Sequence, residues 1–226
     1  MRKLRAVALH LFAGTGGGTL AFRSLGWNVI TIDPDARHAP TFLADPRAWD
    51  DLNASVWSWV CALHPTLVWA TIPPGDEFMP DGEYRRSRRF GRRAFWASRR
   101  VMEATRPLYW VIEAPCHFKT PIERGLSGLA PRIQCGSFLL WGEFPNFDPP
   151  RIASRYRSIT DSSQARERLP RVSGFKAREL LRLARAHVPY ELSQAIAWAV
   201  SDELTFLGTE RMPPALPTPG LLEETG

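Results

Sequence analysis

The sequence predicts an α/β fold, a doubly wound parallel sheet with helices on both faces. Apolar, strand-like runs alternate with segments of helical periodicity over the first 113 residues, and such alternation is typical of parallel sheets. Each run ends in a glycine cluster, an acid or a proline pair, and ligands bind at the carboxyl ends of parallel strands. The length of 226 residues suits one domain. We therefore expect one domain with a single crevice that gathers these polar strand ends.

The first elements follow from apolar runs and their breakers. Leu4–Leu11 is apolar and runs into glycines, which predicts a buried strand. Thr19–Leu25 is expected to be a helix that stops at Gly26, a residue suited to a C-cap. Trp27–Ile32 is the second strand, because Pro34 turns the chain shortly after it. These elements form the first strand–helix–strand unit.

The pattern repeats through the middle of the chain. A short strand is expected at Phe42–Ala44, and Asp50–Leu63 carries apolar residues at helical spacing. Thr66–Ile72 is the next strand and runs into prolines. Tyr84–Arg106 is expected to be a helix, and Leu108–Ile112 a further buried strand. Two more strand–helix units are thus expected.

The pattern changes beyond Pro115. Residues 115–170 are rich in proline, and only Ser137–Trp141 has the pattern of a strand. Phe175–Leu183 is expected to be a basic amphipathic helix. Pro189–Phe206 is expected to be the last helix, with its proline at the start. An irregular insertion therefore precedes the final elements.

Positive charge is concentrated in one segment. The formal net charge is +6, which favours a polyanionic partner. Between residues 85 and 100 the chain has aromatic residues and no acid, so i,i+4 ion pairs cannot form there. We interpret the segment as a phosphate-contacting surface. Its arginines are Arg85, Arg86, Arg88, Arg89, Arg92, Arg93, Arg99 and Arg100.

A glycine turn follows the first strand, in Phe12-Ala13-Gly14-Thr15-Gly16-Gly17-Gly18. Glycines let the backbone approach an anionic or nucleotide ligand, and the following helix offers free N–H donors. Asp33 ends the next strand, where a carboxylate can accept hydrogen bonds from ribose hydroxyls. A P-loop is disfavoured because its lysine pattern is missing. A dinucleotide and S-adenosylmethionine both remain open on these residues.

Five segments resemble motifs of the C5-cytosine DNA methyltransferases, and one of the five is typical of small, phage-type members. The four main motifs occur in the order found in that family and span nearly the whole chain. The segments are Leu11-Phe12-Ala13-Gly14-Thr15-Gly16-Gly17, Thr71-Ile72-Pro73-Pro74-Gly75-Asp76-Glu77-Phe78, Trp110-Val111-Ile112-Glu113-Ala114-Pro115, Gly136-Ser137-Phe138-Leu139-Leu140-Trp141-Gly142 and Val188-Pro189-Tyr190-Glu191-Leu192-Ser193.

The resemblance implies a Rossmann-like S-adenosylmethionine-dependent methyltransferase fold, DNA as partner, and S-adenosylmethionine or S-adenosylhomocysteine as cofactor. It implies that Glu113 is the acid at N3 of a cytosine that has left the stack, and that Asp33 binds the ribose. Asp45 is implied near the adenine. The implied cofactor-binding residues are Phe12, Gly14, Thr15, Gly16, Gly17, Asp33, Asp45, Pro73 and Ser193.

The sequence departs from the family at the nucleophile. Gly75 stands where the family has the cysteine that adds to C6 of the base. Ala114 replaces an asparagine, and His10 replaces an acid. Three explanations stay open: a deliberate replacement in an ordinary methyltransferase, a natural non-catalytic homologue that binds DNA or a partner, and a different reacting residue such as Cys116 or Cys135.

Asp76 and Glu77 beside Gly75 are candidate bases for a non-covalent transfer. The proline pair also resembles the loop of amino-methyltransferases, which need no cysteine. In this chain the polar and aromatic positions around Pro73-Pro74 do not match that loop, so the amino-methyltransferase class stays a further alternative.

The resemblance also divides the chain. Residues 1–115 and 171–208 form the expected cofactor domain, 116–170 a short target-recognition insertion, and 209–226 a flexible tail. Arg132 and Arg155 in or near the insertion join Arg85, Arg86, Arg88, Arg89, Arg92 and Arg93 as expected DNA contacts. Three scattered cysteines favour a reducing cytoplasm. No metal site and no membrane span are expected.

Overall fold

The computed structural model describes residues 6–48, 54–72, 84–116, 130–152, 176, 184 and 187–207, with side chains omitted for 54–56 and 84–90. The strands are β1 (Val7–Leu11), β2 (Asn28–Asp33), β3 (Phe42–Leu43), β4 (Leu67–Thr71), β5 (Tyr109–Pro115), β6 (Ile133–Cys135) and β7 (Phe138–Glu143). The α-helices are α1 (Leu20–Ser24), α2 (Ala54–Ala62), α3 (Tyr84–Thr105) and α7 (Tyr190–Phe206), and the short 3-10 helices are η1 (Gly17–Thr19), η2 (Ala36–His38) and η3 (Pro46–Ala48).

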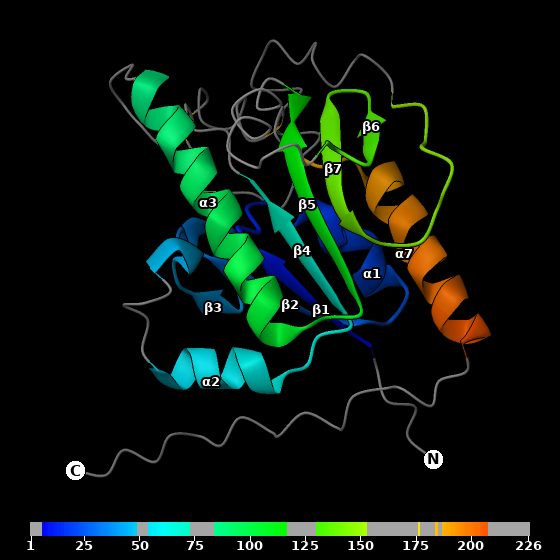
Figure 1. Cartoon of the computed structure of the whole chain (residues 1–226), viewed down its shortest axis with the longest axis horizontal. Coiled ribbons are helices and arrows are strands. Elements are labelled where there is room, and N and C mark those ends of the chain that lie inside the picture. Colours follow the sequence, from blue (N-terminus) through cyan, green and yellow to red (C-terminus); the bar gives the residue numbers. More distant parts are fainter. Residues whose placement is uncertain are drawn as a thin grey trace.

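The strands form a seven-stranded sheet in the order β3-β2-β1-β4-β5-β7-β6 (Figure 1). The first five strands along the sheet pair in parallel, whereas β7 pairs antiparallel with both β5 and β6. The order of the strands along the sheet therefore reverses between β1 and β4, and ligands of such sheets bind outside the carboxyl ends of the strands at this point. The predicted Rossmann-like α/β fold is confirmed.

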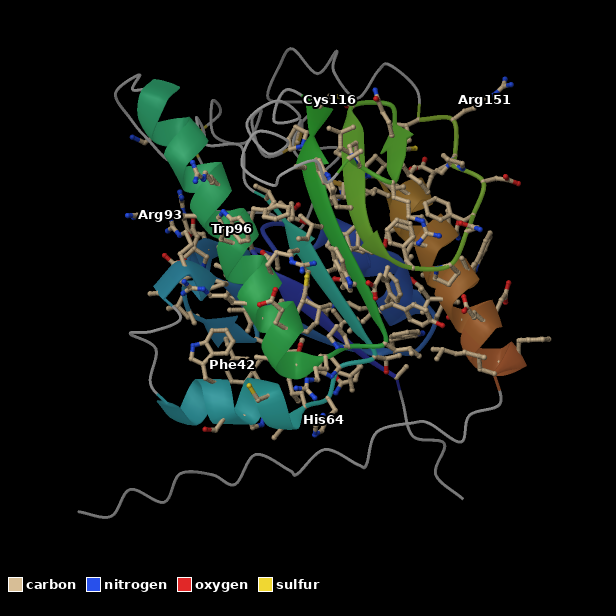
Figure 2. The ribbon with its side chains drawn as sticks, in the orientation of Figure 1. Phe42, His64, Arg93, Trp96, Cys116 and Arg151 are labelled. Atoms are coloured by element: carbon tan, nitrogen blue, oxygen red, sulfur yellow. The ribbon has the colours of Figure 1, made fainter. Side chains whose placement is uncertain are left out.

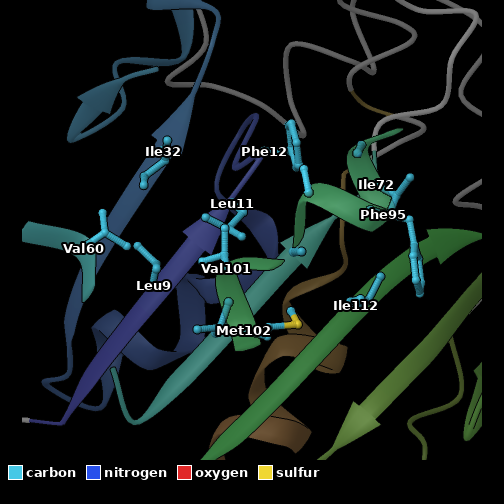
Figure 3. Close-up of a cluster of buried hydrophobic side chains, with 14 of the residues drawn as sticks. Leu9, Leu11, Phe12, Ile32, Val60, Ile72, Phe95, Val101, Met102 and Ile112 are labelled. Atoms are coloured by element: carbon cyan, nitrogen blue, oxygen red, sulfur yellow. The ribbon is translucent and has the colours of Figure 1, made fainter. Parts of the chain in front are cut away.

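Two apolar clusters cover the two faces of the sheet. One cluster joins the sheet to α2 and α3 and includes Val60, Phe95, Val101 and Met102 (Figure 3). The other joins the opposite face to α1 and α7. Four parallel strands, β1, β2, β4 and β5, contribute to both clusters by alternation, so most of their residues are apolar.

Most expected elements lie within a few residues of their predicted places. The strand expected at Ser137–Trp141 is observed as β7, which extends to Glu143 because its pairing with β5 continues as far as Trp110. The short β6 was not predicted, since its three residues have no apolar run of their own. The expected helix at Phe175–Leu183 and the tail at 209–226 lie outside the described residues, and the domain boundaries stay predictions.

Candidate functional site

The glycine turn begins where β1 ends and keeps one side of its backbone open. Phe12, Gly14 and Gly16 have left-handed backbone angles, with φ of 52°, 50° and 78°. A Cβ atom built on Gly14 or Gly16 would meet no atom within 4 Å. Only glycine combines this conformation with an uncovered backbone at low cost. The turn thus presents bare backbone to the crevice, as a bound nucleotide requires.

The last two glycines of the turn have a different task. A Cβ on Gly17 would lie 2.6 Å from the carbonyl oxygen of Val188, and a Cβ on Gly18 would collide with the indole of Trp69. Gly17 therefore lets the C-terminal segment approach the turn, and Gly18 lets the turn pack on β4. Five of the predicted cofactor residues lie in this one turn, namely Phe12, Gly14, Thr15, Gly16 and Gly17.

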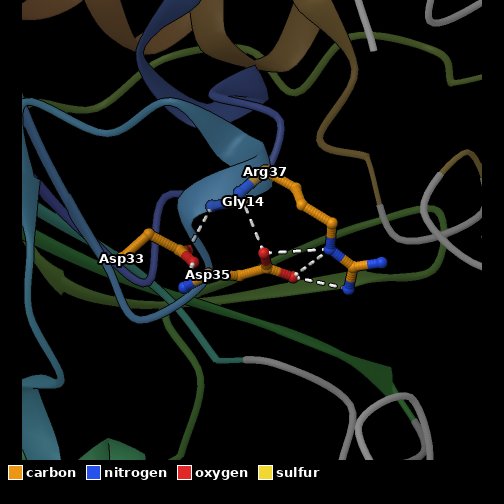
Figure 4. A network of polar contacts seen from close by, with 4 residues as sticks. All are labelled: Gly14, Asp33, Asp35 and Arg37. Atoms are coloured by element: carbon orange, nitrogen blue, oxygen red, sulfur yellow. Dashed lines mark hydrogen bonds and ion pairs between the residues drawn. The ribbon is translucent and has the colours of Figure 1, made fainter. Parts of the chain in front are cut away.

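Asp33, at the end of β2, fastens the turn from the other side (Figure 4). The Gly14 N–H donates to Asp33 Oδ2 at 2.7 Å, and the Asp35 N–H donates to Asp33 Oδ1 at 2.9 Å. The side chain is buried, and burial raises its pKa while these two N–H groups lower it. Each carboxylate oxygen has a second lone pair, so Asp33 can hold the turn and still accept from a ligand hydroxyl.

Two arginine–carboxylate pairs stand at neighbouring strand ends. Arg37 donates to Asp35 through Nε and through Nη2 at 2.7 Å, and Arg47 donates to Asp45 through Nε and through Nη2 at 2.6 Å. Arg37 holds the pKa of Asp35 below its usual range. The same Asp-x-Arg spacing occurs in both segments. Asp45, which was expected near the adenine, thus lies just after β3, and its carboxylate is paired with Arg47.

The start of α7 closes over the glycine turn. The Ser193 hydroxyl donates to the Gly18 carbonyl at 2.9 Å and accepts from the Ala21 N–H at 3.2 Å. A hydrogen bond of 2.6 Å joins Thr15 Oγ1 to Nδ1 of His187. Ser193 therefore lies beside the glycine turn, and His187 is a neighbour of the turn that the sequence did not reveal.

His10 connects the turn to the strand that leads into the expected catalytic loop. Its side chain is buried, with Nδ1 2.9 Å from Thr19 Oγ1 and Nε2 3.0 Å from Thr71 Oγ1. Burial, and to a lesser degree the charge of Arg23, lowers its pKa to about 3. A neutral imidazole ring has one hydrogen-bond donor and one acceptor, and a hydroxyl can pair with either of them. His10 is therefore a neutral bridge between β1, η1 and β4.

Glu113 lies at the carboxyl end of β5, directly beside Thr71 in the sheet register. The Ile72 N–H donates to the Glu113 carbonyl at 2.8 Å, which holds the start of the next loop against β5. The side chain is buried and, by strand alternation with Val111, faces the α1/α7 side of the sheet. Pro73 and Gly75, as well as Asp76 and Glu77, lie outside the described residues.

Neither cysteine named as a replacement nucleophile is well placed to act with Glu113, although Cys135, unlike Cys116, belongs to the cluster on the α1/α7 side of the sheet. Cys116 packs on the α2/α3 side of the sheet, and its thiol donates to the Gly136 carbonyl at 3.6 Å. Cys135 is buried and donates to the Pro150 carbonyl at 3.1 Å, and burial raises its pKa to about 11. A nucleophilic thiol needs a lowered pKa and access. The structure therefore favours neither thiol as a partner of Glu113.

The predicted DNA contacts fall in different surroundings. Arg92 and Arg93 are exposed on α3. Arg132 donates to the Phe144 carbonyl and, at 2.6 Å, to Oδ1 of Asn146, so much of its guanidinium is used within the fold. The side chains of Arg85, Arg86, Arg88, Arg89 and Arg155 lie outside the described residues.

The described part of the chain has neither a group of three or more His, Cys, Asp and Glu suited to a metal ion nor a helix long and apolar enough to cross a membrane. No family model and no curated protein matches the sequence. Among solved structures, the chain is similar to a protein described as a DNA modification methyltransferase encoded within a prophage of E. coli. The two share 16% identity with a TM-score of 0.37, over 54% of this chain and 37% of that one.

Proposed function

We propose that this chain binds S-adenosylmethionine or S-adenosylhomocysteine at the glycine turn and acts on DNA as a homologue of the C5-cytosine methyltransferases. The observation that supports the cofactor most directly is the bare backbone at Gly14 and Gly16, above a carboxylate, Asp33, that can still accept hydrogen bonds. Open glycines before a helix suit a nucleoside with a charged tail. The family resemblance of the motifs narrows this nucleoside to S-adenosylmethionine.

The residues present fit such a group. Phe12, Gly14, Thr15 and Gly16 would line its tail, Asp33 its ribose and Asp45 the region of its adenine, with Pro73 beside the expected catalytic loop. When bound, S-adenosylmethionine supplies a methyl group on a sulfonium, ready for attack by a nucleophile. Ser193 holds the turn through Gly18 and α1 rather than through the ligand. These roles are part of the proposal.

C5 transfer by the family route is not expected from this sequence. The route needs a thiolate that adds to C6 of cytosine, and Gly75 has no side chain. Glu113 remains at the end of β5 as the acid for N3 of the base. We therefore infer a methyltransferase scaffold whose cofactor and DNA sites are kept while the covalent step is lost.

The cofactor proposal is tested by calorimetry with S-adenosylhomocysteine. Gly16 and Gly26 have similar backbones, with φ of 78° and 82°, and open space at the Cβ position. A Gly→Ala change costs each position about 1–2 kcal/mol of strain, but only Gly16 belongs to the glycine turn. We expect Gly16→Ala to weaken binding at least about tenfold, or 1.4 kcal/mol, and Gly26→Ala to leave it unchanged. Equal affinities for both variants, or no binding by the wild type, would overturn the proposal.

The loss of the covalent step is tested by restoring the cysteine nucleophile at position 75. We expect the double variant Gly75→Cys, Ala114→Asn to form 5-methylcytosine in DNA and to be trapped covalently on DNA that contains 5-fluorocytosine. The wild type is expected to do neither. 5-Methylcytosine formed by the wild type would show that another residue acts, and a variant that binds S-adenosylhomocysteine but never reacts would show divergence beyond the nucleophile.

A further inference from the structure

The outer side of α3 combines an exposed tryptophan with arginines. Arg92, Arg93, Trp96 and Arg100 are exposed, and their spacing of three to four residues places them on one side of the helix. Figure 2 shows Arg93 and Trp96 on the side of α3 that faces away from the sheet. We name these four residues the α3 basic face. Trp96 itself is 44% exposed.

The α3 basic face has a rigid base. Phe95 is buried and meets Trp141 with ring centroids 6.4 Å apart, and its ring also meets Trp96 at 6.0 Å and an angle of 87°. One turn further on, Arg99 lies over the ring of Trp110 at 5.0 Å and pairs with Glu103 at 3.3 Å. The Trp96 ring is thus presented by an ordered helix, so little conformational entropy is lost when a flat ligand stacks on it.

The charge around Trp96 selects for an anionic ligand. The sequence has eight arginines and no acid from Arg85 to Arg100, all within α3. The helix follows β4 and precedes the parallel β5, so its arginine-rich start lies toward the carboxyl edge of the sheet, where the glycine turn and Glu113 are (Figure 1). The basic residues therefore extend along the helix from Trp96 toward the candidate site.

A second exposed tryptophan lies on a helix without basic residues. Trp198 on α7 is 53% exposed, more than Trp96. Its helix carries the acids Glu191, Asp202 and Glu203 and no basic residue. Among the described residues, two tryptophans are thus exposed, but only the one on α3 is surrounded by arginines. This difference points to a ligand with both flat rings and negative charge.

We propose that the α3 basic face binds an unpaired nucleic-acid strand, with Arg92 and Arg93 at phosphates and Trp96 stacked on a base. In a duplex the base faces are covered by their neighbours, so a helix-borne indole can stack only on a base that is unpaired. This inference rests on the proposed function for nucleic acid as the substrate class. It adds that a single strand, rather than a duplex, occupies α3 beside the site.

The proposal is tested with the full chain and a fluorescent oligothymidylate of about 12 nucleotides, within the usual span of single-strand sites. We expect Trp96→Ala to weaken binding about 5- to 100-fold, as loss of one stacked base does. Trp96→Phe keeps a ring and is expected to bind within about threefold of the wild type. Trp198→Ala is the matched control and is expected to leave binding unchanged.

The arginines are tested by salt dependence. Loss of two phosphate contacts to a single strand reduces the slope of log affinity against log salt by about 1.4. We expect this reduction in the double variant Arg92→Gln, Arg93→Gln. All substituted residues are exposed, and thermal melts check that each variant folds. Equal binding by Trp96→Ala and Trp198→Ala, tighter binding of a duplex of the same length, or equal binding of polyglutamate would overturn the proposal. S-adenosylhomocysteine binding, measured in the same variants, shows separately whether the cofactor proposal holds.

Discussion

At the scale of single residues, His10 is the side chain whose role changed most between sequence and structure. The sequence marks it only as a departure from an acid. In the structure it is a buried, neutral bridge whose two ring nitrogens meet Thr19 and Thr71. A charged carboxylate there would need donors from both sides, whereas a neutral imidazole donates to one hydroxyl and accepts from the other. The replacement is therefore compatible with an ordered turn.

The low pKa of His10 predicts a pH-dependent stability. Burial lowers this pKa from 6.5 to about 3, so between these values the unfolded chain binds a proton that the folded chain does not. As the pH is lowered below 6, His10 should therefore reduce the free energy of unfolding by about 1.4 kcal/mol per pH unit. Above pH 7.5, His10 should contribute no pH dependence. Urea unfolding of wild type and His10→Gln from pH 7.5 to 4.5 measures the difference.

The exposed His64, labelled in Figure 2, supplies the control. His64→Gln is expected to keep the wild-type dependence on pH, while His10→Gln should have a shallower one. Parallel curves for wild type and His10→Gln would mean that His10 is not held neutral.

At the scale of elements, α7 is the part that completes the candidate site. It packs against α1 and reaches the glycine turn through Ser193, about 175 residues from Gly18 in sequence. Its side facing the sheet includes Leu192 and Ile196 and belongs to the α1/α7 cluster. Pro189 precedes its first turn, which fixes where the helix begins. The last helix thus packs against the glycine turn and supports it.

Substitution of two serines of α7 can distinguish a contribution to the glycine turn from a contribution to overall stability. Ser193 holds Gly18 and Ala21, whereas Ser201 accepts from the Trp27 indole at 3.3 Å. We expect Ser193→Ala to cost about 1–3 kcal/mol of stability and Ser201→Ala about 0.5–1.5 kcal/mol. Only Ser193→Ala should also weaken S-adenosylhomocysteine binding in calorimetry. A Ser201→Ala variant with the same loss of affinity would show that α7 supports the turn only through overall stability.

At the scale of the whole molecule, the candidate site ties the two ends of the described chain together. Thr15 and His187 are 172 residues apart and share a hydrogen bond of 2.6 Å. The glycine turn thus contacts β2 on one side and the start of α7 on the other. A ligand on this turn should stabilise the whole domain, not a local loop.

Ligand binding should therefore raise the midpoint of global unfolding. At a concentration of S-adenosylhomocysteine of about 100 times its Kd, the gain is about 2.7 kcal/mol. For a domain of this size we expect a rise in Tm of about 5–10 °C. Melts followed by far-ultraviolet circular dichroism and by tryptophan fluorescence should shift together. A shift seen by one probe only would indicate local ordering, and the same shift in Gly16→Ala would place the ligand elsewhere.

The sequence alone determined the order of the first strands and helices, because buried parallel strands are continuous apolar runs between breakers. It also determined the glycine turn, the carboxylates at strand ends and the arginine-rich helix, since each is a local pattern. It could not find β6, which depends on pairing with β7. The helix expected at Phe175–Leu183 lies outside the described residues and stays a prediction.

Only the tertiary structure decided how the glycines divide their tasks. Gly14 and Gly16 face open space while Gly17 and Gly18 face Val188 and Trp69, and no local pattern distinguishes the two pairs. The same holds for the bridge through His10, the contact of His187 with the turn and the opposite faces of Cys116 and Glu113. These are contacts between residues far apart in the chain, so they exist only once the sheet register and the packing of α7 bring them together.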